Sequence, residues 1–384
     1  MPTSPHAAFL AVRDDLRGCL LERDSAIDNA LLALLSGEHY LQLGPPGTAK
    51  SLLVRALACR IDGARYFEKL MTSFTAPEEI YGPLDLVGYA DRGEYRRLSA
   101  GSLSEASIAF LDEIPRANSA ILNALLTIMN ERLLHEVGMP PQRVPLLSLY
   151  AAANDTFGDG LAALNDRFLL REIIPYVSDE ASFVQLVTGS LDALTPGAIL
   201  SLSEVHQAQT EAQHVKGTQE ALTALLALRQ RLTAEGIAVS DRKWRQCGKL
   251  LKARAWLDGV PELDLTCLRA LVHALWTDPK ERKAVERAVD EIACPLDLRA
   301  VELEDQAAAI VDSLPAPTHR DYTPQCENAL MSLADMFTLL KKEVEQSASR
   351  DTTKPLACLA KIHTLHKSIG EKLYKSLARM SIPA

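Results

Sequence analysis

The residues with the clearest chemical signature form a glycine-rich turn in the N-terminal part of the chain. Backbone N–H groups of such a turn, with the N-terminus of the helix that follows, cradle phosphate oxygens. The Lys50 ammonium brings a positive charge to the β- and γ-phosphates, and the Ser51 hydroxyl is placed to hold Mg²⁺. The predicted phosphate-binding residues are Gly44, Pro45, Pro46, Gly47, Thr48, Ala49, Lys50, Ser51 and Leu52.

One position of this turn departs from the usual pattern G-x-x-x-x-G-K-[ST]. Ala49 stands where that pattern has glycine. Alanine is tolerated there only with a negative φ, so we expect φ below zero at Ala49. An alternative interpretation of the turn alone is a Gly-Pro loop before an ordinary surface lysine.

A second group, two adjacent carboxylates, argues against that alternative. The apolar strand 107–111 leads directly into Asp112 and Glu113, about sixty residues after the turn. Ligand sites of doubly wound sheets lie at the carboxyl ends of their strands. Asp112 is expected in the Mg²⁺ shell, and Glu113 is expected to polarise the attacking water. Together the two groups predict hydrolysis of ATP with Mg²⁺.

Two polar residues further along the chain fit the same chemistry. Asn154 ends the next apolar strand, 147–153, where its amide could orient the water; asparagine is also common at any strand-to-turn junction. Arg167 lies in the segment N-D-R-F on a short helix. A guanidinium stabilises a transferring phosphoryl group by ~10³–10⁵ in rate. Arg167 is expected to serve a neighbouring chain's site, the alternative being a surface pair with Asp166.

A third arginine is expected in a helical lid. Arg242 follows Ser240 at the start of a predicted helix over 243–257. From that position an arginine can close onto the γ-phosphate and couple nucleotide state to lid angle. Arg245 is the second choice, and a basic, solvent-facing helix surface explains either residue equally well.

The pattern of apolar residues predicts the elements that position these groups. Strands alternate with helices up to about Tyr176, which indicates a parallel, doubly wound α/β sheet. A β-hairpin is expected at 87–96, a second hairpin or a loop at 133–147, and only helices after Ser178. The predicted domains are 1–180, 181–295 and 296–384, with a break at 314–317 and two paired amphipathic helices in the tail.

Composition narrows the class of protein. The formal charge is −9 and no basic block stands out, which argues against a protein that grips nucleic-acid backbones. The seven cysteines are scattered and never form C-x-x-C, so they are expected to be reduced thiols. No apolar run reaches the length of a membrane span, and no signal-peptide core is present. A cytoplasmic location is therefore expected.

Read as an ordered set, several segments resemble the MoxR family of AAA+ ATPases. They are G-P-P-G-T-A-K-S, I-A-F-L-D-E-I, L-N-A-L-L-T-I-M-N-E-R, A-A-A-N-D, N-D-R-F and S-D-R-K-W. The segment F-E-K-L-M-T-S-F-T-A-P-E-E-I-Y-G-P-L looks most like the RavA subgroup, and the resemblance covers about residues 15–280. It implies an AAA+ P-loop αβα core with a parallel sheet, then an all-α lid and a helical C-terminal region.

The resemblance also implies roles for individual residues. Lys50 and Ser51 would belong to Walker A, and Asp112 and Glu113 to Walker B. Asn154 would be sensor 1, Arg167 the arginine finger and Arg242 sensor 2. The pair Glu22–Arg23 would border the adenine, and 87–96 would be the helix-2 insert.

Family members form hexameric rings and act as chaperone-like remodelers, often with a von Willebrand factor A (vWA) domain protein as partner. The tail departs from RavA, which carries a β-rich partner-binding domain, since only about 90 mostly helical residues follow the lid here. Those helices are expected either to dock a partner or to brace the core. Two other functions remain open: a slow nucleotide-dependent switch or scaffold, and a nucleic-acid motor of the McrB type.

Overall fold

A five-stranded parallel sheet carries the predicted site residues, in the order β3-β4-β7-β1-β8. The structure, a computed structural model, describes residues 4–93, 96–135, 140–154, 157, 161–189, 192–316, 319–346 and 352–380. The strands of the sheet are β1 (Tyr40–Leu43), β3 (Tyr66–Leu70), β4 (Ile108–Asp112), β7 (Ser148–Ala153) and β8 (Leu170–Ile173). The predicted α/β class with a parallel sheet is confirmed.

The register of this sheet places the ends of three strands at one edge. Leu43 at the end of β1 pairs with Ala153 at the end of β7. Leu111, one residue before the end of β4, pairs with Ala151 of β7. The residues that follow these strands therefore emerge side by side, as a doubly wound sheet requires.

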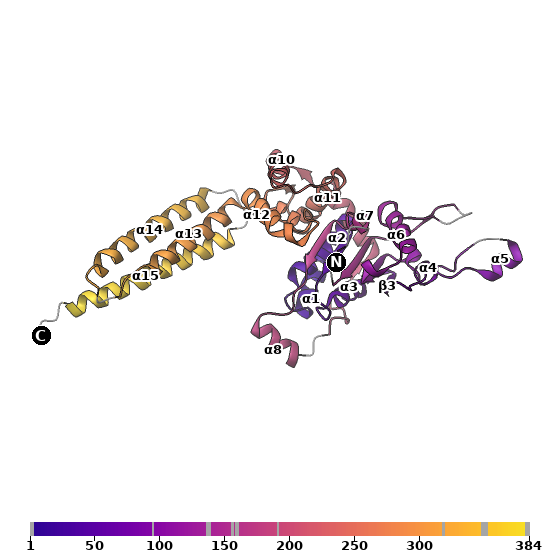
Figure 1. The fold of residues 1–384 in the computed structure, drawn as a ribbon, viewed down its shortest axis with the longest axis horizontal. Helices are drawn as coiled ribbons and strands as arrows, with labels where there is room; N and C mark the ends of the chain where they lie inside the picture. The colour runs from indigo at the N-terminus through magenta and orange to yellow at the C-terminus, as the bar shows by residue number, and fades with distance from the viewer. Residues whose placement is uncertain are drawn as a thin grey trace. The chain divides into compact units, whose positions relative to one another are not determined.

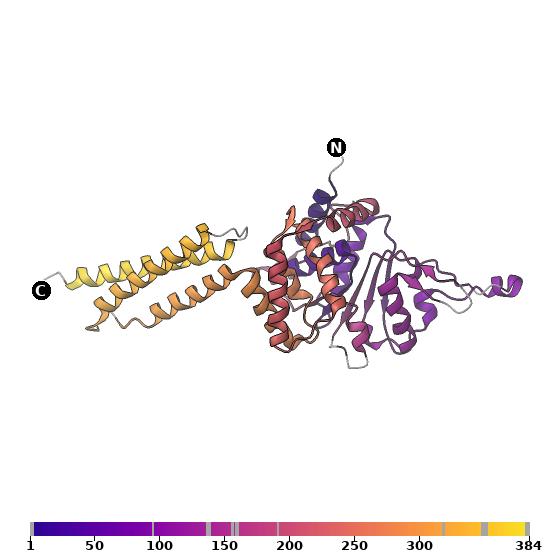
Figure 2. The same ribbon diagram turned by 90° about the horizontal axis from the view of Figure 1, so that it is seen from above.

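Helices cover both faces of the sheet (Figures 1 and 2). The helices within residues 4–188 are α1 (Pro5–Cys19), α2 (Asp24–Ser36), α3 (Lys50–Cys59), α4 (Pro77–Tyr81), α5 (Leu86–Arg92), α6 (Ser119–Glu131), α7 (Ala162–Asn165) and α8 (Glu180–Thr188), of which α5 lies at the end of an arm away from the sheet (Figure 1). Short 3₁₀ turns flank β4 at Leu103–Glu105 and Ile114–Arg116. Local chemistry starts these helices: the Asn118 side chain caps α6 by accepting from the Ile121 N–H.

The central helix α2 fixes the sheet from one side. It packs against β1, β7 and β8, and the Tyr150 hydroxyl donates to the Ala30 carbonyl of α2 at 2.9 Å. Tyr40 and Tyr150 meet edge to face with ring centres 6.3 Å apart. Every residue of β1 and β7 is buried. The strands that end in the site residues thus lie in a rigid core.

The first predicted hairpin is wrong over its first half, and the second is confirmed. Residues 86–92 form the helix α5, because Asp85 caps it at the Gly88 N–H and Gly93 ends it with φ +68. The arm that carries α5 (Figure 1) is closed at its base by an antiparallel bridge between Leu84 and Arg97. In the second region β5 (Leu133–Leu134) pairs antiparallel with β6 (Gln142–Arg143). Residues 94–95 and 136–139 lie outside the described ranges.

The part of the chain after Ser178 is mostly but not wholly helical. Its helices are α9 (Leu202–Gln213), α10 (Gln219–Ala234), α11 (Asp241–Leu257), α12 (Arg282–Ala293), α13 (Pro295–Asp312), α14 (Tyr322–Gln346) and α15 (Thr353–Met380), with 3₁₀ segments at Thr266–His273 and Pro279–Glu281. Three two-residue strands correct the all-helical expectation: β9 (Leu200–Ser201) pairs with β2 (Ile61–Asp62), and β10 (Lys216–Gly217) with β11 (Glu262–Leu263). Such short pairings leave no periodic signal in a sequence.

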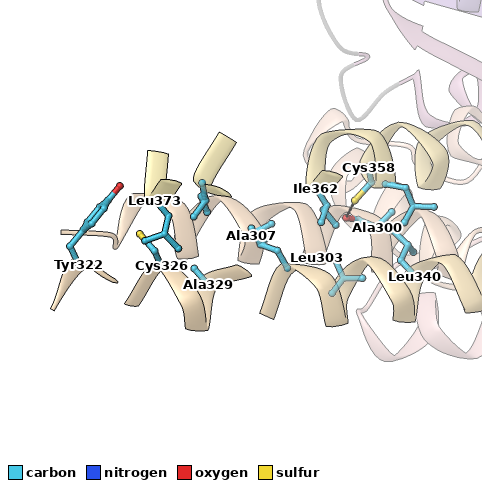
Figure 3. Packing of buried hydrophobic residues seen from close by; sticks show 13 residues of the cluster. Ala300, Leu303, Ala307, Tyr322, Cys326, Ala329, Leu340, Cys358, Ile362 and Leu373 are labelled. Carbon is cyan, nitrogen blue, oxygen red and sulfur yellow. Dashed lines mark hydrogen bonds between the residues drawn. The ribbon is translucent and has the colours of Figure 1, made fainter. Parts of the chain in front are cut away.

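The chain divides into two compact units, residues 1–222 with 232–285, and residues 223–231 with 286–384. In the second unit α14 and α15 pack together as predicted, and α13 packs against α15 as a third helix. Figure 3 shows their shared apolar core, in which Leu303, Ile362 and Leu340 are buried. Helix α13 ends at Asp312, next to the predicted break. Within the described residues no helix has the length and apolar character of a membrane crossing.

Candidate active site

The turn after β1 can be built only with glycine at its first position. Gly44 has φ +148, and a Cβ there would lie 2.3 Å from the carbonyl oxygen of Ile174. Its N–H donates to the Ala153 carbonyl at 3.1 Å, which ties the turn to the end of β7. Gly47 has φ +81 with open space beside it, so the chain can curl around a ligand at that point.

Ala49 is held in the left-handed conformation, with φ +66 and ψ 23. The expectation of a negative φ is therefore wrong. An L-residue in this conformation costs about 1–2 kcal/mol, and it persists because the residues on both sides are fixed by the turn and by α3. No side chain caps α3. Its first N–H groups consequently point toward the turn as donors for a ligand oxygen.

Lys50 brings the turn, the acidic pair and Asn154 into one place. Its ammonium donates to the carbonyls of Gly44 and Pro45 at 2.6 and 2.8 Å, and lies 3.5 Å from Oδ1 of Asn154. Burial lowers the pKa of Lys50, and the nearby charges of Asp112 and Glu113 oppose that shift. The ammonium is held by neutral carbonyls, so phosphate oxygens can replace them.

The acidic pair ends β4 in a sharp turn. Glu113 has φ +52, an unusual conformation for a non-glycine residue, and its N–H donates to Oδ1 of Asp112 at 3.0 Å. Its carboxylate lies 3.5 Å from the Arg116 guanidinium. Backbone conformations of this kind concentrate at functional sites. Here the turn sends two consecutive carboxylates out at the edge where Lys50 lies.

This donor set fits a magnesium–triphosphate. Mg²⁺ is usually bound by one or two protein oxygens together with phosphates and waters, rather than by an all-protein cage. Ser51 follows Lys50 in the first turn of α3, and Asp112 ends β4. Among the described residues there is no group of three or more His, Cys, Asp or Glu side chains that could hold a metal ion.

A cavity of about 510 Å³ adjoins the phosphate turn and has room for a nucleoside. Its lining includes Gly47, Thr48, Ala49 and Leu52 of the turn and of α3. It also includes the large apolar or aromatic side chains Leu20, Leu21, Tyr176, Phe183 and Leu186. We call it the nucleotide cavity. A flat apolar base needs walls of this kind.

Arg23 and Glu22, both predicted to border the adenine, have different surroundings. Arg23 is buried, lines the nucleotide cavity, and donates to the carbonyls of Thr48 and Pro175 at 3.2 and 2.8 Å. These two bonds tie the phosphate turn to the segment that follows β8. Glu22 is not among the residues that line the cavity. Its carboxylate accepts from the backbone of Asp179 and Ser178, which lowers the pKa of Glu22 and fixes the segment that leads into α8.

Helix α8 contributes residues that the sequence analysis missed. Phe183 and Leu186 stand three residues apart and line the nucleotide cavity. No residue of α8 is buried, and Phe183 is 57% exposed. The segment S-F-V-Q-L-V reads simply as amphipathic helix, so only its position beside the turn reveals a role in the cavity.

Arg167 and Arg242 lie together in a second cavity of about 400 Å³. Its lining, which we call the arginine cavity, consists of Gly37, Glu38, Met129, Asn130, Arg132, Arg167, Arg242, Arg245, Gln246 and Lys249. None of these belongs to the phosphate turn. Arg167 Nε is buried and, among the described residues, has no hydrogen-bond partner. Arg245, the second choice for the lid arginine, lies in the same cavity.

The lid helix α11 is held in this position by contacts with α2 and with Glu38, which follows the C-terminus of α2. Glu38 is buried and accepts from Gln246 and Lys249 at 2.5 and 2.8 Å. Near the other end of α11, Arg254 pairs with Asp28 of α2 at 3.2 Å. In this arrangement Arg242 faces the arginine cavity and not its own phosphate turn.

Comparisons with known proteins identify the fold. A family model described as the MoxR domain in the MoxR-vWA-beta-propeller ternary systems matches residues 8–205, just over half of the chain. The chain belongs to the MoxR family of AAA+ ATPases. A model of an AAA lid domain matches residues 220–289.

Relatives of this MoxR-family chain support the assignment. An uncharacterized protein of Methanocaldococcus jannaschii is 38% identical over 283 residues, 73% of each chain. The protein MoxR of Methylorubrum extorquens is 24% identical over 344 residues, 79% of this chain and 93% of its own. A crystal structure of a candidate ATPase from Cytophaga hutchinsonii has a TM-score of 0.59 at 19% identity, covering 74% of this chain and 94% of its own. That structure shows the shared fold.

Two buried cations of the MoxR-family chain act on each other, one on the sheet and one on the lid helix. Arg171 of β8 is buried, donates to the Asn165 side chain and the Trp276 carbonyl, and burial lowers the pKa of Arg171 to about 10. Lys243 of α11 is 2% exposed and donates to the Thr277 hydroxyl at 3.3 Å. Burial, and then repulsion from Arg171, lower the pKa of Lys243 to about 7.

Lys243 is expected to make stability depend on pH. The unfolded chain binds the proton of Lys243 up to about pH 10.5 and the folded chain only up to about pH 7. Burial of Lys243 thus destabilises the fold most at pH 7 and below, and this cost vanishes as pH rises toward 10.5. We predict that Lys243→Met raises the free energy of unfolding at pH 7 by a few kcal/mol, at about 1.4 kcal/mol per pKa unit, and by much less at pH 10.

Urea denaturation of parent and variant at several pH values measures this difference. Lys252→Met is the matched control, because Lys252 lies on the same helix and donates to an exposed carbonyl, that of Gln213. A pH-independent gap between Lys243→Met and the parent would contradict the prediction.

Proposed function

We propose that this MoxR-family chain hydrolyses ATP with Mg²⁺ and uses the energy to remodel or activate a protein partner in a chaperone-like way. The observation that carries the proposal is the convergence at one sheet edge of Lys50, the pair Asp112–Glu113 and Asn154. A slow switch or scaffold would have no need of a carboxylate and an amide facing the same phosphate turn.

Each residue has a role in this proposal. The phosphate turn and Lys50 hold the triphosphate, and Ser51 with Asp112 holds Mg²⁺, which neutralises phosphate charge. Glu113 accepts a proton from the attacking water, and Asn154 orients that water. Arg23 keeps the turn in place through the Thr48 carbonyl. Phe183 and Leu186 cover the base.

The arginines are proposed to act between chains. Arg167 and Arg242 line the arginine cavity, whereas the phosphate turn lines the nucleotide cavity of the same chain. A complete centre then needs the nucleotide cavity of one copy and the arginine cavity of the next. Repeated head to tail, this contact closes into a ring, which we take to be a hexamer as the family resemblance implies. The unsatisfied Nε of Arg167 supports an incoming oxygen acceptor.

The proposed partner is a vWA domain protein. The matching family model is described by systems that combine MoxR, vWA and β-propeller proteins. The RavA-like segment noted in the sequence points to the same kind of partner. The tail bundle α13–α15 offers a separate compact unit for docking or bracing.

The first prediction separates binding from hydrolysis. Lys50→Ala is expected to lose nucleotide binding, because the turn then lacks its cation. Glu113→Gln is expected to bind ATP normally but hydrolyse it at least ~100-fold more slowly, as the amide cannot accept the proton. Fluorescent-nucleotide titration and phosphate release measure the two steps. Glu68→Gln, on the neighbouring strand β3, is the control; hydrolysis by Glu113→Gln at the parent rate would refute the assignment of the base.

The second prediction tests action between chains. Arg167→Ala is expected to keep ATP binding and lose hydrolysis by ~10³-fold or more. Mixing it with Lys50→Ala should restore phosphate release, because Lys50→Ala chains lend intact arginines to intact nucleotide cavities. Two affinity tags verify that mixed rings form. A mixture in which Lys50→Ala is replaced by the double variant Lys50→Ala, Arg167→Ala should stay inactive; inactive mixed rings in the first case would exclude action in trans.

The third prediction concerns the partner. A vWA domain protein from the same organism, co-expressed with this chain, should co-purify with Glu113→Gln in the presence of ATP, because the variant is held in the triphosphate state. Lys50→Ala, which lacks that state, should retain at least severalfold less. Equal recovery with both variants, or no vWA protein with either, would overturn the partner assignment and leave the hydrolysis proposal intact.

A further inference from the structure

Asp166 stands at the meeting point of the two arginines assigned to the neighbouring site. It follows α7, and its N–H donates to the Ala162 carbonyl at 2.9 Å. Its Oδ2 lies 3.9 Å from Nη1 of Arg167 and 3.8 Å from Nη1 of Arg242. Its Oδ1 accepts from the Ser240 hydroxyl at 3.3 Å. One carboxylate therefore pairs with Arg167, with the lid's arginine and with the residue that caps α11.

The backbone on both sides of this carboxylate is fixed. Phe168 is fully buried just after Arg167, and Asn165 accepts from the buried Arg171. On the lid side the Ser240 hydroxyl accepts from the Lys243 N–H at 3.2 Å and so begins α11. Asp166 is consequently held in place, whereas the two arginine side chains are long, and ordering a long side chain costs rotamer entropy.

Charge explains why a carboxylate is needed at this point. The arginine cavity gathers Arg132, Arg167, Arg242, Arg245 and Lys249, with Glu38 occupied by Gln246 and Lys249. Two guanidiniums that face one small space repel each other, so without a shared counter-ion they would turn outward into water. The negative charges of Asp166 and Glu281 also raise the pKa values of the buried cations Arg171 and Lys243, against the larger lowering caused by burial.

We propose that Asp166 is a positioning residue that holds Arg167 and Arg242 side by side. The nucleotide phosphates bound by a second copy of this chain then replace Asp166 as the partner of both arginines. The inference rests on the proposed action between chains and adds how the arginines are prepared for it. Both ion pairs are long, so they orient the guanidiniums without competing strongly with a multiply charged phosphate group. Donors arranged before the reaction contribute most to catalysis because they need no reorganisation.

A purely structural role would be a tether between α7 and the lid. The lid helix has other attachments that do not involve Asp166, namely Glu38 at its middle and Asp28 at its C-terminal end. Asp166→Asn keeps an oxygen for the Ser240 hydroxyl and removes only the charge. It therefore separates the tether from the counter-ion.

The first test is kinetic. Asp166→Asn is expected to lower kcat about tenfold and to change KM for ATP less than about twofold, since the chain's own nucleotide cavity is untouched. Asp166→Glu, which keeps the charge, should retain more of kcat than Asp166→Asn does. Asp258→Asn is the matched control, because Asp258 pairs with Arg254 at the far end of α11.

A coupling cycle decides whether Asp166 acts through the arginines. In a background of Arg167→Ala with Arg242→Ala, single-turnover hydrolysis should fall less than about twofold on adding Asp166→Asn. A fall of the same size as in the parent would overturn the proposal. If Arg167→Ala itself hydrolysed ATP at the parent rate, the proposed action of Arg167 between chains would be wrong. The experiment therefore distinguishes a failure of that proposal from a failure of the role given to Asp166.

A second readout needs no turnover. Modification of arginines by a dicarbonyl reagent, followed by peptide mass spectrometry, reports how each guanidinium is held. Asp166→Asn should raise the modification rates of Arg167 and Arg242 severalfold and leave that of Arg55 unchanged, because Arg55 pairs with Glu68. Unchanged rates at Arg167 and Arg242 would show that Asp166 does not hold them.

Discussion

The close approach of Gly44 to the Ile174 carbonyl is the contact on which the rest of the site depends. A Cβ at Gly44 would lie 2.3 Å from that oxygen, so the turn can pass between β7 and β8 only without a side chain. The parallel register then brings the ends of β1, β4 and β7 to the same edge. Lys50, Glu113 and Asn154 lie close together because the strands that precede them all end at this edge.

A second constraint, the clamp of α11 onto Glu38 and Asp28, divides the chemistry over two cavities. The phosphate turn faces one cavity and the lid arginine faces the other. Under the proposed action between chains, each chain carries halves of two different centres. The carboxylate of Asp166 belongs to this division, since it contacts arginines from the core and from the lid at once.

Local patterns in the sequence predict the sheet, the phosphate turn and the acidic pair, because strand, turn and helix follow one another within a few residues. The backbone of Ala49 was beyond such reasoning, since its positive φ is imposed by α3 and the turn. Likewise α5 replaces a hairpin because the Asp85 cap outweighs an alternating pattern. The place of α8 and the shared counter-ion at Asp166 depend on contacts between segments far apart in the chain, which no local pattern encodes.

The exposed apolar side of α8 has a thermodynamic consequence. Phe183 and Leu186 line the nucleotide cavity, yet no residue of α8 is buried. Under the proposed function, a bound base would remove part of this surface from water, and its departure would return that surface to solvent. The nucleotide-free chain would then expose more apolar area and self-associate more readily. The proposal thus links solubility to nucleotide occupancy, with saturating nucleotide favouring the dispersed, folded state.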